Sequence, residues 1–271
     1  MLSVKDLSVE FRGVSGAPFE AVKHINFLLH KEETLAIVGE SGSGKSVATL
    51  ALTQLLPRSP ICRVSGDVRL NGGENLLTMT KRQIQKVRGA SIAYIFQNPS
   101  TALNPSLTAG FQIAEAVQWH QPGKDARVET LDLLHKVGLS SQHYKAYPFE
   151  LSGGMQQRVM VAMALACNPK ILVADEPTTA LDVTLQRQMI DLLKHLRQTE
   201  HLAVIFITHN LSLIKNFSDN VLVMFKGEIV EQGATEKILQ FPQHPYTRAL
   251  LECIPSLDHF PERLKSIEEI Y

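Results

Sequence analysis

A glycine-rich segment near the start of the chain restricts the folds that this sequence can adopt. Residues 39–46 read GESGSGKS and fit the pattern G-x-x-x-x-G-K-[ST]. They lie between an apolar, β-rich run at 34–38 and a stretch at 46–56 whose apolar residues recur at helical spacing until Pro57. A strand, a glycine loop and a helix in this order form a cradle in which backbone N–H groups and the helix N-terminus bind phosphate.

Each residue type in this loop has an expected task. The glycines let the backbone curl without side-chain clashes, while Lys45 reaches the β- and γ-phosphates and the Ser46 hydroxyl binds Mg²⁺. The alternative is a glycine-rich turn without a ligand, and the flanking strand and helix argue against it. The residues that we expect to contact the nucleotide here are Gly39, Glu40, Ser41, Gly42, Ser43, Gly44, Lys45, Ser46 and Val47.

Composition argues against several classes of protein. The 271 residues include 27 basic and 27 acidic side chains, so the formal net charge is zero, whereas nucleic-acid-binding proteins usually carry a basic excess. Cys62, Cys167 and Cys253 are widely spaced and fit no metal or disulfide pattern. The N-terminus lacks a signal-peptide pattern, and the longest apolar stretch, at 159–167, is too short to span a bilayer. We therefore expect a soluble chain, for which any role at a membrane would come through a partner.

Strand-like and helix-like segments alternate along the chain, which favours an α/β fold. We expect a phosphate-loop NTPase core, with a mostly parallel sheet covered by helices on both faces, an N-terminal antiparallel β subdomain and an inserted α-helical subdomain at 98–157. The segment at 2–11 alternates apolar and polar residues and is predicted to be an edge strand. The other expected strands are 19–29, 34–38, 171–174, 203–208 and a hairpin at 221–230 turning at Lys226–Gly227, and the expected helices are 46–56, 108–120, 126–137, 159–166 and 184–196.

Two adjacent carboxylates follow one of the apolar strands. The run 171–174 ends directly before Asp175 and Glu176. At the C-terminal end of a parallel strand, Asp175 can hold Mg²⁺ through water and Glu176 can polarise an attacking water molecule. The alternative is an acidic pair at a strand end that only contacts solvent. The phosphate loop in the same chain argues against this alternative.

A second glycine motif identifies a family. Residues 151–158 read LSGGMQQR, which resembles the signature sequence of ATP-binding cassette (ABC) ATPases. Physically, a serine and two glycines at the start of a helix offer hydroxyl and backbone donors to an anion. The resemblance implies that this surface faces the γ-phosphate of ATP bound to the opposite subunit, through Ser152, Gly153, Gly154 and Gln157.

Three further positions match elements of the same family, and a fourth is a candidate. Gln97 matches the glutamine that senses Mg²⁺ and the γ-phosphate, and is expected among the metal-binding residues with Ser46 and Asp175. Asp182, after Ala180 and Leu181, matches the loop that communicates across the dimer, and His209 matches the switch histidine that contacts the γ-phosphate. The catalytic residues implied are therefore Glu176, His209 and Gln97. Phe11 is our candidate for the aromatic side chain that stacks on adenine, with Phe19 as the alternative.

The sequence departs from the family pattern at one turn. Residues 31–33 read KEE, where relatives usually carry glycine before the final glutamate. If this turn needs a positive φ, Glu32 costs the fold about 1 kcal/mol. The departure does not touch the residues expected to bind nucleotide.

Three segments resemble the importers for di- and oligopeptides, nickel and metal chelates. They are 244–250 (HPYTRAL), 98–105 (NPSTALNP) and 147–150 (YPFE). We interpret the whole chain, 1–271, as a single nucleotide-binding domain with a C-terminal tail of this type at 241–271. Many members carry a cysteine cluster for an iron–sulfur centre after the tail motif, and because only Cys253 lies there we expect none. The short form resembles the nickel and metal-chelate importers slightly more than the oligopeptide importers.

The resemblance implies an ATP-binding and ATP-hydrolysing subunit with ATP and Mg²⁺ as cofactors. Two such subunits, this chain and a paralogous or identical partner, would act on two transmembrane permease subunits at the cytoplasmic face of the membrane. An extracytoplasmic substrate-binding protein would take part indirectly, and no nucleic acid is expected.

The sequence argues against two other functions. A soluble ABC ATPase of DNA repair or translation would carry two cassettes or a long coiled-coil insertion, and the sequence contains neither. A degenerate module that closes without hydrolysing ATP would lack the catalytic glutamate, the histidine or the signature, and all three are present.

Overall fold

A computed structural model describes residues 1–12, 17–57, 59–179 and 181–253. The chain forms two compact units. The first contains Met1–Ile84 and the residues from Ile205 onward, and the second contains Gln85–Val204. The chain passes from one unit to the other in α2 (Lys81–Val87) and in β7 (Ala203–Thr208).

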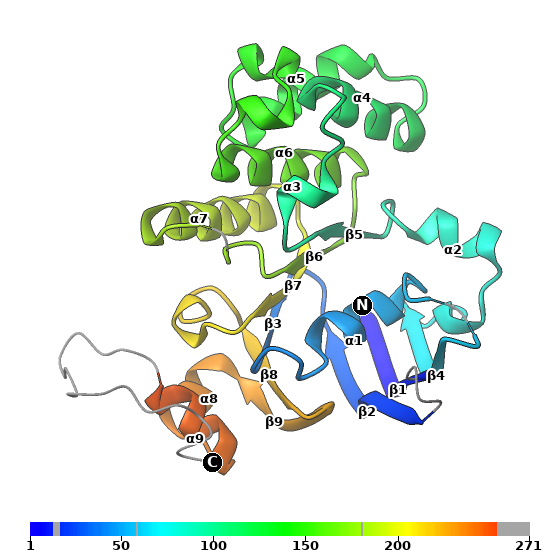
Figure 1. Cartoon of the computed structure of the whole chain (residues 1–271), viewed down its shortest axis with the longest axis vertical. Helices are drawn as coiled ribbons and strands as arrows, with labels where there is room; N and C mark the ends of the chain where they lie inside the picture. Colours follow the sequence, from blue (N-terminus) through cyan, green and yellow to red (C-terminus); the bar gives the residue numbers. More distant parts are fainter. Residues whose placement is uncertain (13–16, 58, 180, 254–271) are drawn as a thin grey trace. The chain divides into compact units, whose positions relative to one another are not determined.

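An antiparallel sheet opens the first unit (Figure 1). Its strands are β1 (Leu2–Arg12), β2 (Pro18–Leu29) and β4 (Cys62–Leu70), in the order β2-β1-β4. The prediction of β1 as an edge strand is therefore wrong, because β4 covers its second edge. β4 escaped prediction because only two of its nine residues, Cys62 and Val68, are buried, so it lacks a clear apolar alternation.

A second group of strands in the first unit carries the glycine loop. All five residues of β3 (Thr34–Val38) are buried, as expected for a parallel strand covered on both faces. β3 pairs in parallel with β8 (Asn220–Phe225), and β8 pairs antiparallel with β9 (Glu228–Ala234). The predicted hairpin turn is confirmed: Lys226 and Gly227 have φ of 48° and 87°, the positive values that a tight two-residue hairpin turn needs.

Helix α1 (Lys45–Leu52) follows the glycine loop but ends four residues earlier than predicted. Gln54 has φ 55°, and its N–H donates to Ala51 O while the Leu55 N–H donates to Leu50 O. This pair of bonds is a Schellman motif, which ends the helix before Pro57 is reached. The remaining helices of this unit are η1 (Leu76–Thr78), η4 (Leu211–Leu213), α8 (Thr235–Gln240) and α9 (Pro245–Glu252).

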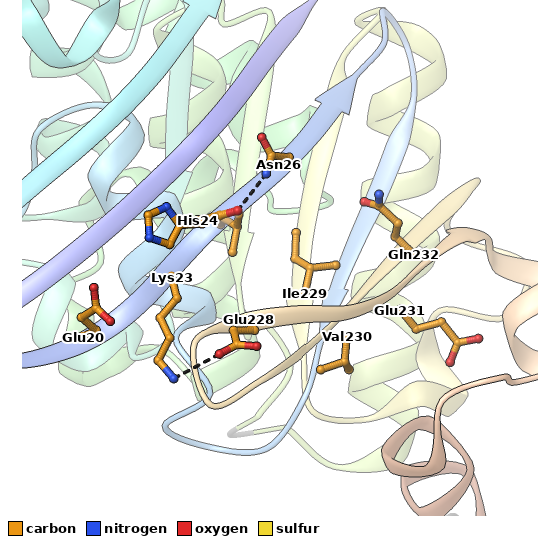
Figure 2. Close-up of a pocket in the computed structure, with 10 residues that line it drawn as sticks. Glu20, Lys23, His24, Asn26, Glu228, Ile229, Val230, Glu231 and Gln232 are labelled. Carbon is orange, nitrogen blue, oxygen red and sulfur yellow. Dashed lines mark hydrogen bonds and ion pairs between the residues drawn. The ribbon is translucent and has the colours of Figure 1, made fainter.

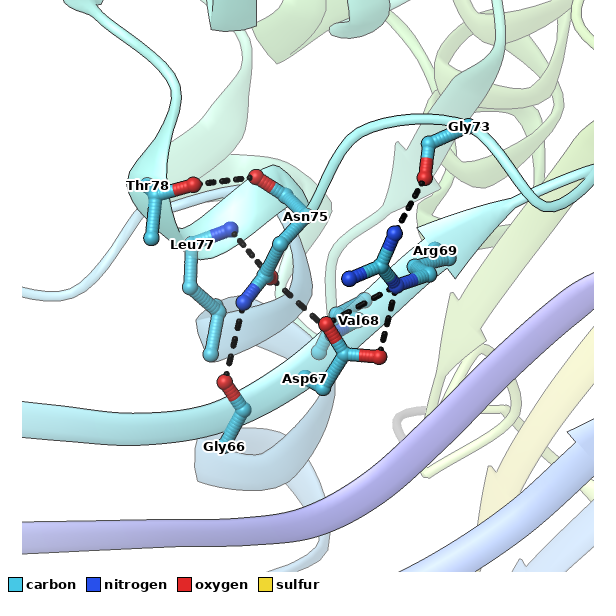
Figure 3. A network of polar contacts seen from close by, with 8 residues as sticks. All are labelled: Gly66, Asp67, Val68, Arg69, Gly73, Asn75, Leu77 and Thr78. Carbon is cyan, nitrogen blue, oxygen red and sulfur yellow. Dashed lines mark hydrogen bonds and ion pairs between the residues drawn. The ribbon is translucent and has the colours of Figure 1, made fainter.

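The side chain of Asn75 fixes the loop after β4 (Figure 3). Its Oδ1 accepts hydrogen bonds from Val68 N and Leu77 N, both at 3.0 Å, and its Nδ2 donates to Gly66 O at 3.0 Å. One amide therefore satisfies three backbone groups at the point where the strand gives way to η1.

The second unit contains two parallel strands and a group of helices. β5 (Ile92–Ile95) pairs in parallel with β6 (Ile171–Asp175). The predicted helices at 108–120 and 126–137 correspond to α4 and α5. The helices are α3 (Pro99–Ala102), α4 (Ala109–His120), α5 (Ala126–Lys136), η2 (Ser141–Lys145), η3 (Pro148–Glu150), α6 (Gly153–Ala166) and α7 (Val183–Thr199).

Helices α4, α5 and α6 pack against one another (Figure 1). Thr108 and Asp125 begin α4 and α5 as N-caps, since their side chains accept backbone N–H groups of the first turn. Gly110 lets α4 approach η2 closely, because a Cβ at this position would lie 2.4 Å from the Tyr144 ring. Within the described part of the chain, no helix is long and apolar enough to cross a membrane.

The parallel pairs β3/β8 and β5/β6, together with the helices of both units, confirm the predicted α/β fold class. The antiparallel sheet of β1, β2 and β4 confirms the predicted N-terminal β subdomain. β3, β5 and β6 are each followed by a loop that carries one of the predicted polar motifs, which is the usual position for ligand-binding residues in such folds.

The turn between β2 and β3 has the backbone conformation that the sequence comparison anticipated. Glu32 has φ 59°, a left-handed conformation that costs a non-glycine residue about 1–2 kcal/mol. The neighbouring Glu33 is buried and accepts hydrogen bonds from His30 N and Asn220 Nδ2, so the turn is held in this shape from both sides.

Replacing Glu32 by glycine should therefore stabilise the protein. Relief of the left-handed strain exceeds the entropy that glycine adds to the unfolded chain, so we expect a gain of about 0.5–1 kcal/mol, or about 1–3 °C in Tm. Thermal unfolding measures this gain. Lys31→Gly, in the same turn but outside the residues with positive φ, is the control and should lower Tm. An unchanged or lower Tm for Glu32→Gly would contradict the assignment of strain.

Candidate nucleotide-binding site

The glycine loop leaves no room for side chains at two of its positions. A Cβ on Gly39 would lie 2.2 Å from Met224 O, and a Cβ on Gly44 would lie 2.5 Å from Ala21 O. Gly44 also has φ 101°, where other residues are strained. The loop therefore presses directly against the backbones of β8 and β2, and only glycine allows this fit.

Lys45 is folded back over the start of the loop. Its side chain is only 4% exposed, and its Nζ donates to Gly39 O at 2.8 Å and to Glu40 O at 2.7 Å. A buried ammonium group that is held by backbone carbonyls sits beside the first turn of α1, where Ser46 and Val47 are partly exposed. The first N–H groups of a helix have no partner within the helix, so this end favours an anion.

The hairpin between β8 and β9 supports the loop from behind. Gly227 N donates to Ser43 O at 3.1 Å, and Gly227 O accepts from Lys23 N on β2 at 2.8 Å. One turn residue thus joins the glycine loop to the antiparallel sheet.

An open hollow of about 620 Å³ lies beside Gly42. Phe19 lines it and is 63% exposed, an unusual exposure for a large aromatic side chain. Phe11, which lies opposite Phe19 in the β1/β2 register, is partly buried and does not line the hollow. The hollow is lined by Glu10, Pro18, Phe19, Glu20, Ala21, Lys23, Gly42, Lys226 and Gly227.

A second hollow, of about 630 Å³, lies along β2 and β9 (Figure 2). Most of the residues that line it are charged or polar, and Lys23 and Glu228 form an ion pair across it at 3.2 Å. It contains no residue of the glycine loop, so its position gives it no part in phosphate binding.

The acidic strand end in the second unit brings two predicted residues together. Ile95 on β5 is in register with Ala174 on β6, so Gln97 and Glu176, two residues further along each strand, come side by side. Gln97 Nε2 donates to Glu176 Oε2 at 3.1 Å. Thr179 Oγ1 donates to the same oxygen at 2.8 Å.

Glu176 combines burial with backbone strain. Its side chain is 8% exposed and its φ is 45°. Non-glycine residues persist in this conformation only where their surroundings enforce it, and such positions concentrate at functional sites. Asp175, the last residue of β6, precedes it and is partly exposed.

The signature segment begins α6. Ser152 is the N-cap, since its Oγ accepts from Met155 N at 3.3 Å, and Ser152 and Gly153 are exposed. Gln157, by contrast, is only 2% exposed, and its Nε2 has no hydrogen-bond partner among the described residues. Asp182 is also an N-cap, accepting from Leu185 N at 2.9 Å at the start of α7.

The predicted site residues therefore fall into two groups. The first unit holds the glycine loop, Phe11, Phe19 and His209, which follows β7 and is exposed. The second unit holds Gln97, Asp175, Glu176, Asp182 and the signature segment. The sequence analysis did not identify Thr179 or Tyr246 as site residues. The hydroxyl of Tyr246 accepts a hydrogen bond from Glu40 N at 3.0 Å. The sequence feature that could have identified Thr179 is its position three residues after Glu176, since residues at this spacing can meet across one turn of the chain.

These features define a phosphate-loop ATPase: a glycine cradle and a buried lysine follow one parallel strand, and a glutamate held by glutamine and threonine follows another. The comparisons with known sequences agree. Residues 22–179 match the family described as ABC transporter, and residues 230–270 match the oligopeptide/dipeptide transporter C-terminal region. The chain belongs to the ABC transporter family, and it is an ATPase.

Individual relatives make the same point. The chain is 46% identical to a dipeptide transport ATP-binding protein of Haemophilus influenzae, over 100% of this chain and 82% of the relative. It is 45% identical to an oligopeptide transport ATP-binding protein of Bacillus subtilis, over 95% and 73%. A solved dimeric ATP-binding cassette with ADP and phosphate superimposes with a TM-score of 0.77, at 27% identity over 87% of this chain and 99% of that one.

The hollow beside Gly42 gives a test of the adenine-binding side chain. Phe19→Ala should weaken ATP binding about 10-fold, since an aromatic stack on a base is worth about 1–3 kcal/mol. Titration with a fluorescent ATP analogue measures this, and Phe149→Ala, at a side chain that is 74% exposed in the other unit, is the control. If Phe11→Ala weakens binding and Phe19→Ala does not, the stacking residue is Phe11, as the sequence pattern suggested.

Proposed function

We propose that this chain is the ATP-binding and ATP-hydrolysing subunit of an ABC importer for di- or oligopeptides. The observation that carries the proposal is the match of residues 230–270 to the oligopeptide/dipeptide transporter C-terminal region, on a chain whose cassette matches the ABC transporter family. The relatives named above are dipeptide and oligopeptide transport proteins and match nearly the whole of this chain, which supports peptide over nickel or metal-chelate cargo.

We assign nucleotide binding to residues 39–47. The backbone of this loop is too tightly packed for side chains at Gly39 and Gly44, and such a cradle fits phosphate oxygens. Lys45, now held by two carbonyls, has the charge to contact the β- and γ-phosphates once they are bound. Phe19 or Phe11 would support the adenine ring.

We assign Mg²⁺ binding to Ser46, Asp175 and Gln97. Their hydroxyl, carboxylate and amide groups each offer a hard oxygen ligand of the kind that this ion prefers. When bound, Mg²⁺ would neutralise the charge that develops on the phosphates. The rest of the chemistry falls to side chains of the protein.

We assign the general base to Glu176. Its carboxylate is held at one oxygen by Gln97 and Thr179, which fixes the direction in which the group can accept a proton from water. His209 is assigned to the γ-phosphate, where a histidine can donate a hydrogen bond and keep the attacking water in line.

The signature surface is assigned to a second nucleotide-binding subunit. Ser152 and Gly153 are exposed at the start of a helix, so they can cover the γ-phosphate bound to a partner. Gly154, Gln157 and Asp182 are assigned to the same interface. The related cassette solved with ADP and phosphate is dimeric. ATP would then favour the closed dimer because it contacts both subunits only in that state.

The inserted helical subdomain is proposed to press on the permease near residues 98–107, which would place the chain, with two permease subunits, at the cytoplasmic face of the membrane. The tail at 241–271 is proposed as a feature of this importer branch. An extracytoplasmic binding protein would deliver the cargo. A soluble ABC ATPase of DNA repair or translation remains the alternative, and the relatives named above do not favour it.

Replacing Glu176 by glutamine should slow ATP hydrolysis by about 10²–10⁴ while ATP remains bound, because the amide cannot accept the proton of water. Phosphate release and nucleotide binding are measured on the same preparation. Glu115→Gln, at an exposed glutamate of α4, is the matched control and should hydrolyse normally. Normal turnover by Glu176→Gln would remove this residue from the role of base.

The cargo is tested with the complex of this chain, its permease subunits and its binding protein in lipid vesicles. We expect a dipeptide to stimulate ATP hydrolysis several-fold and nickel ions or a nickel chelate to leave it unchanged. Stimulation by nickel alone would overturn the assignment of peptide cargo. Purification of the chain with ribosomes or DNA instead of a permease would favour the alternative function.

A further inference from the structure

The tail helix α9 reaches the glycine loop through one buried tyrosine. Tyr246 is fully buried, and its ring packs against Phe225 of β8 with the ring centres 4.2 Å apart. Its hydroxyl oxygen accepts a hydrogen bond from Glu40 N at 3.0 Å. A residue of the tail motif is thus in direct contact with the second residue of the phosphate-binding loop.

This hydrogen bond and that of Lys45 meet on one peptide group. The N–H of Glu40 and the carbonyl of Gly39 belong to the same planar peptide unit. The N–H points to Tyr246, and the carbonyl accepts from Lys45 Nζ at 2.8 Å. Rotation of this peptide would break both bonds. The tyrosine hydroxyl and the lysine ammonium therefore hold the same peptide group in one orientation. Hydrogen bonds joined through one polar group strengthen one another in a low-dielectric interior.

The position of Tyr246 is fixed by the turn before it. Glu231 on β9 accepts hydrogen bonds from Gln243 N at 2.7 Å and His244 N at 3.0 Å. Burial raises the pKa of Glu231, but these bonds outweigh it and hold the pKa below its usual value. His244 is the N-cap of α9, since its Nδ1 accepts from Tyr246 N at 3.2 Å. Pro245 follows at the first helical position, which suits proline.

The motif at 244–246 is therefore accounted for by geometry. The histidine caps the helix, the proline begins it and the tyrosine projects into the core. Only the hydroxyl group of Tyr246 is left without a role in building the helix, and it contacts the glycine loop.

We propose that Tyr246 is a positioning residue for ATP binding, which fixes the Gly39–Glu40 peptide and through it the ammonium group of Lys45. This inference rests on the proposed role of residues 39–47 in binding nucleotide. It gives the tail motif a function within the cassette itself: the loop that binds phosphate is preorganised by a helix that follows it by about two hundred residues. Preorganisation of a binding loop improves affinity because less order is lost on binding.

The hydroxyl group keeps its proton over the physiological range. Burial raises the pKa of Tyr246 to about 12, so the phenol stays neutral well above pH 9. The contribution of Tyr246 to ATP binding should therefore not change between pH 6.5 and 9.

The test is Tyr246→Phe in the assembled transport complex, which removes the hydroxyl and keeps the ring against Phe225. We expect KM for ATP to rise about 5- to 10-fold, the usual worth of one buried hydrogen bond, with kcat changed less than two-fold. The rise should be the same at pH 6.5 and 9. Tyr144→Phe is the matched control, since the Tyr144 ring packs against α4 in the other unit, and it should leave KM unchanged. A wild-type KM in Tyr246→Phe, or a loss confined to kcat, would overturn the proposal.

A double-variant cycle shows whether the hydroxyl acts through Glu40. Glu40→Pro removes the N–H donor and also the Glu40 side chain, which interacts with the same hydroxyl, and Glu40 is not among the residues with positive φ. In the Glu40→Pro background, adding Tyr246→Phe should change KM by less than about two-fold, because the bond is already absent. An equal effect of Tyr246→Phe in both backgrounds would show that the hydroxyl acts elsewhere and would overturn the proposal.

Two further measurements keep the inference separate from folding and from the proposed function. In the unmodified protein without nucleotide, the Glu40 amide should exchange its hydrogen slowly. Exchange at the rate of an open loop would overturn the proposal even if the variant did not fold.

Lys45→Ala should abolish ATP binding. If it does so while Tyr246→Phe behaves as wild type, only the positioning role falls; if Lys45→Ala binds ATP normally, the proposed function falls and the positioning role with it.

Discussion

The rest of the site depends on the close packing of the glycine loop against the backbones of β8 and β2. Gly39 lies against Met224 O and Gly44 against Ala21 O, at distances that exclude a Cβ atom. This contact sets the path of residues 39–44, and the path in turn brings Lys45 to the carbonyls of Gly39 and Glu40. A phosphate-binding loop needs its N–H groups aimed before the ligand arrives, and here the surrounding backbone holds the loop in place.

The second unit arranges its chemistry by a different device. Parallel pairing of β5 with β6 brings Gln97 and Glu176 side by side at the ends of the two strands. The backbone at Glu176 has a left-handed conformation. Burial of the side chain and the hydrogen bond from Thr179 hold the carboxylate in one orientation. The strained backbone is a cost in stability that the neighbouring contacts offset. The result is a carboxylate whose direction is set by strand register, which suits the proposed role of general base.

The features that could be predicted from sequence were those in which neighbours in the chain are neighbours in space. The glycine loop, the hairpin at Lys226–Gly227 and the positive φ at Glu32 each depend on a few consecutive residues. Gln97 and Glu176 are 79 residues apart, and sequence placed each in its own motif without predicting the hydrogen bond between them. β4 was missed because most of its residues are not buried, and the central place of β1 was missed with it. The contact of Tyr246 with Glu40 spans 206 positions and involves a backbone N–H, which no side-chain pattern records.

The hairpin turn at Lys226–Gly227 has a consequence for how this chain can vary. Turns between antiparallel strands usually accept insertions, because they extend into solvent and nothing depends on their length. Here the amide of Gly227 is bound to Ser43 and its carbonyl to Lys23. An added residue would separate these two bonds and detach the glycine loop from the sheet beneath it. The length of this surface turn is therefore under the same constraint as the residues of a buried core.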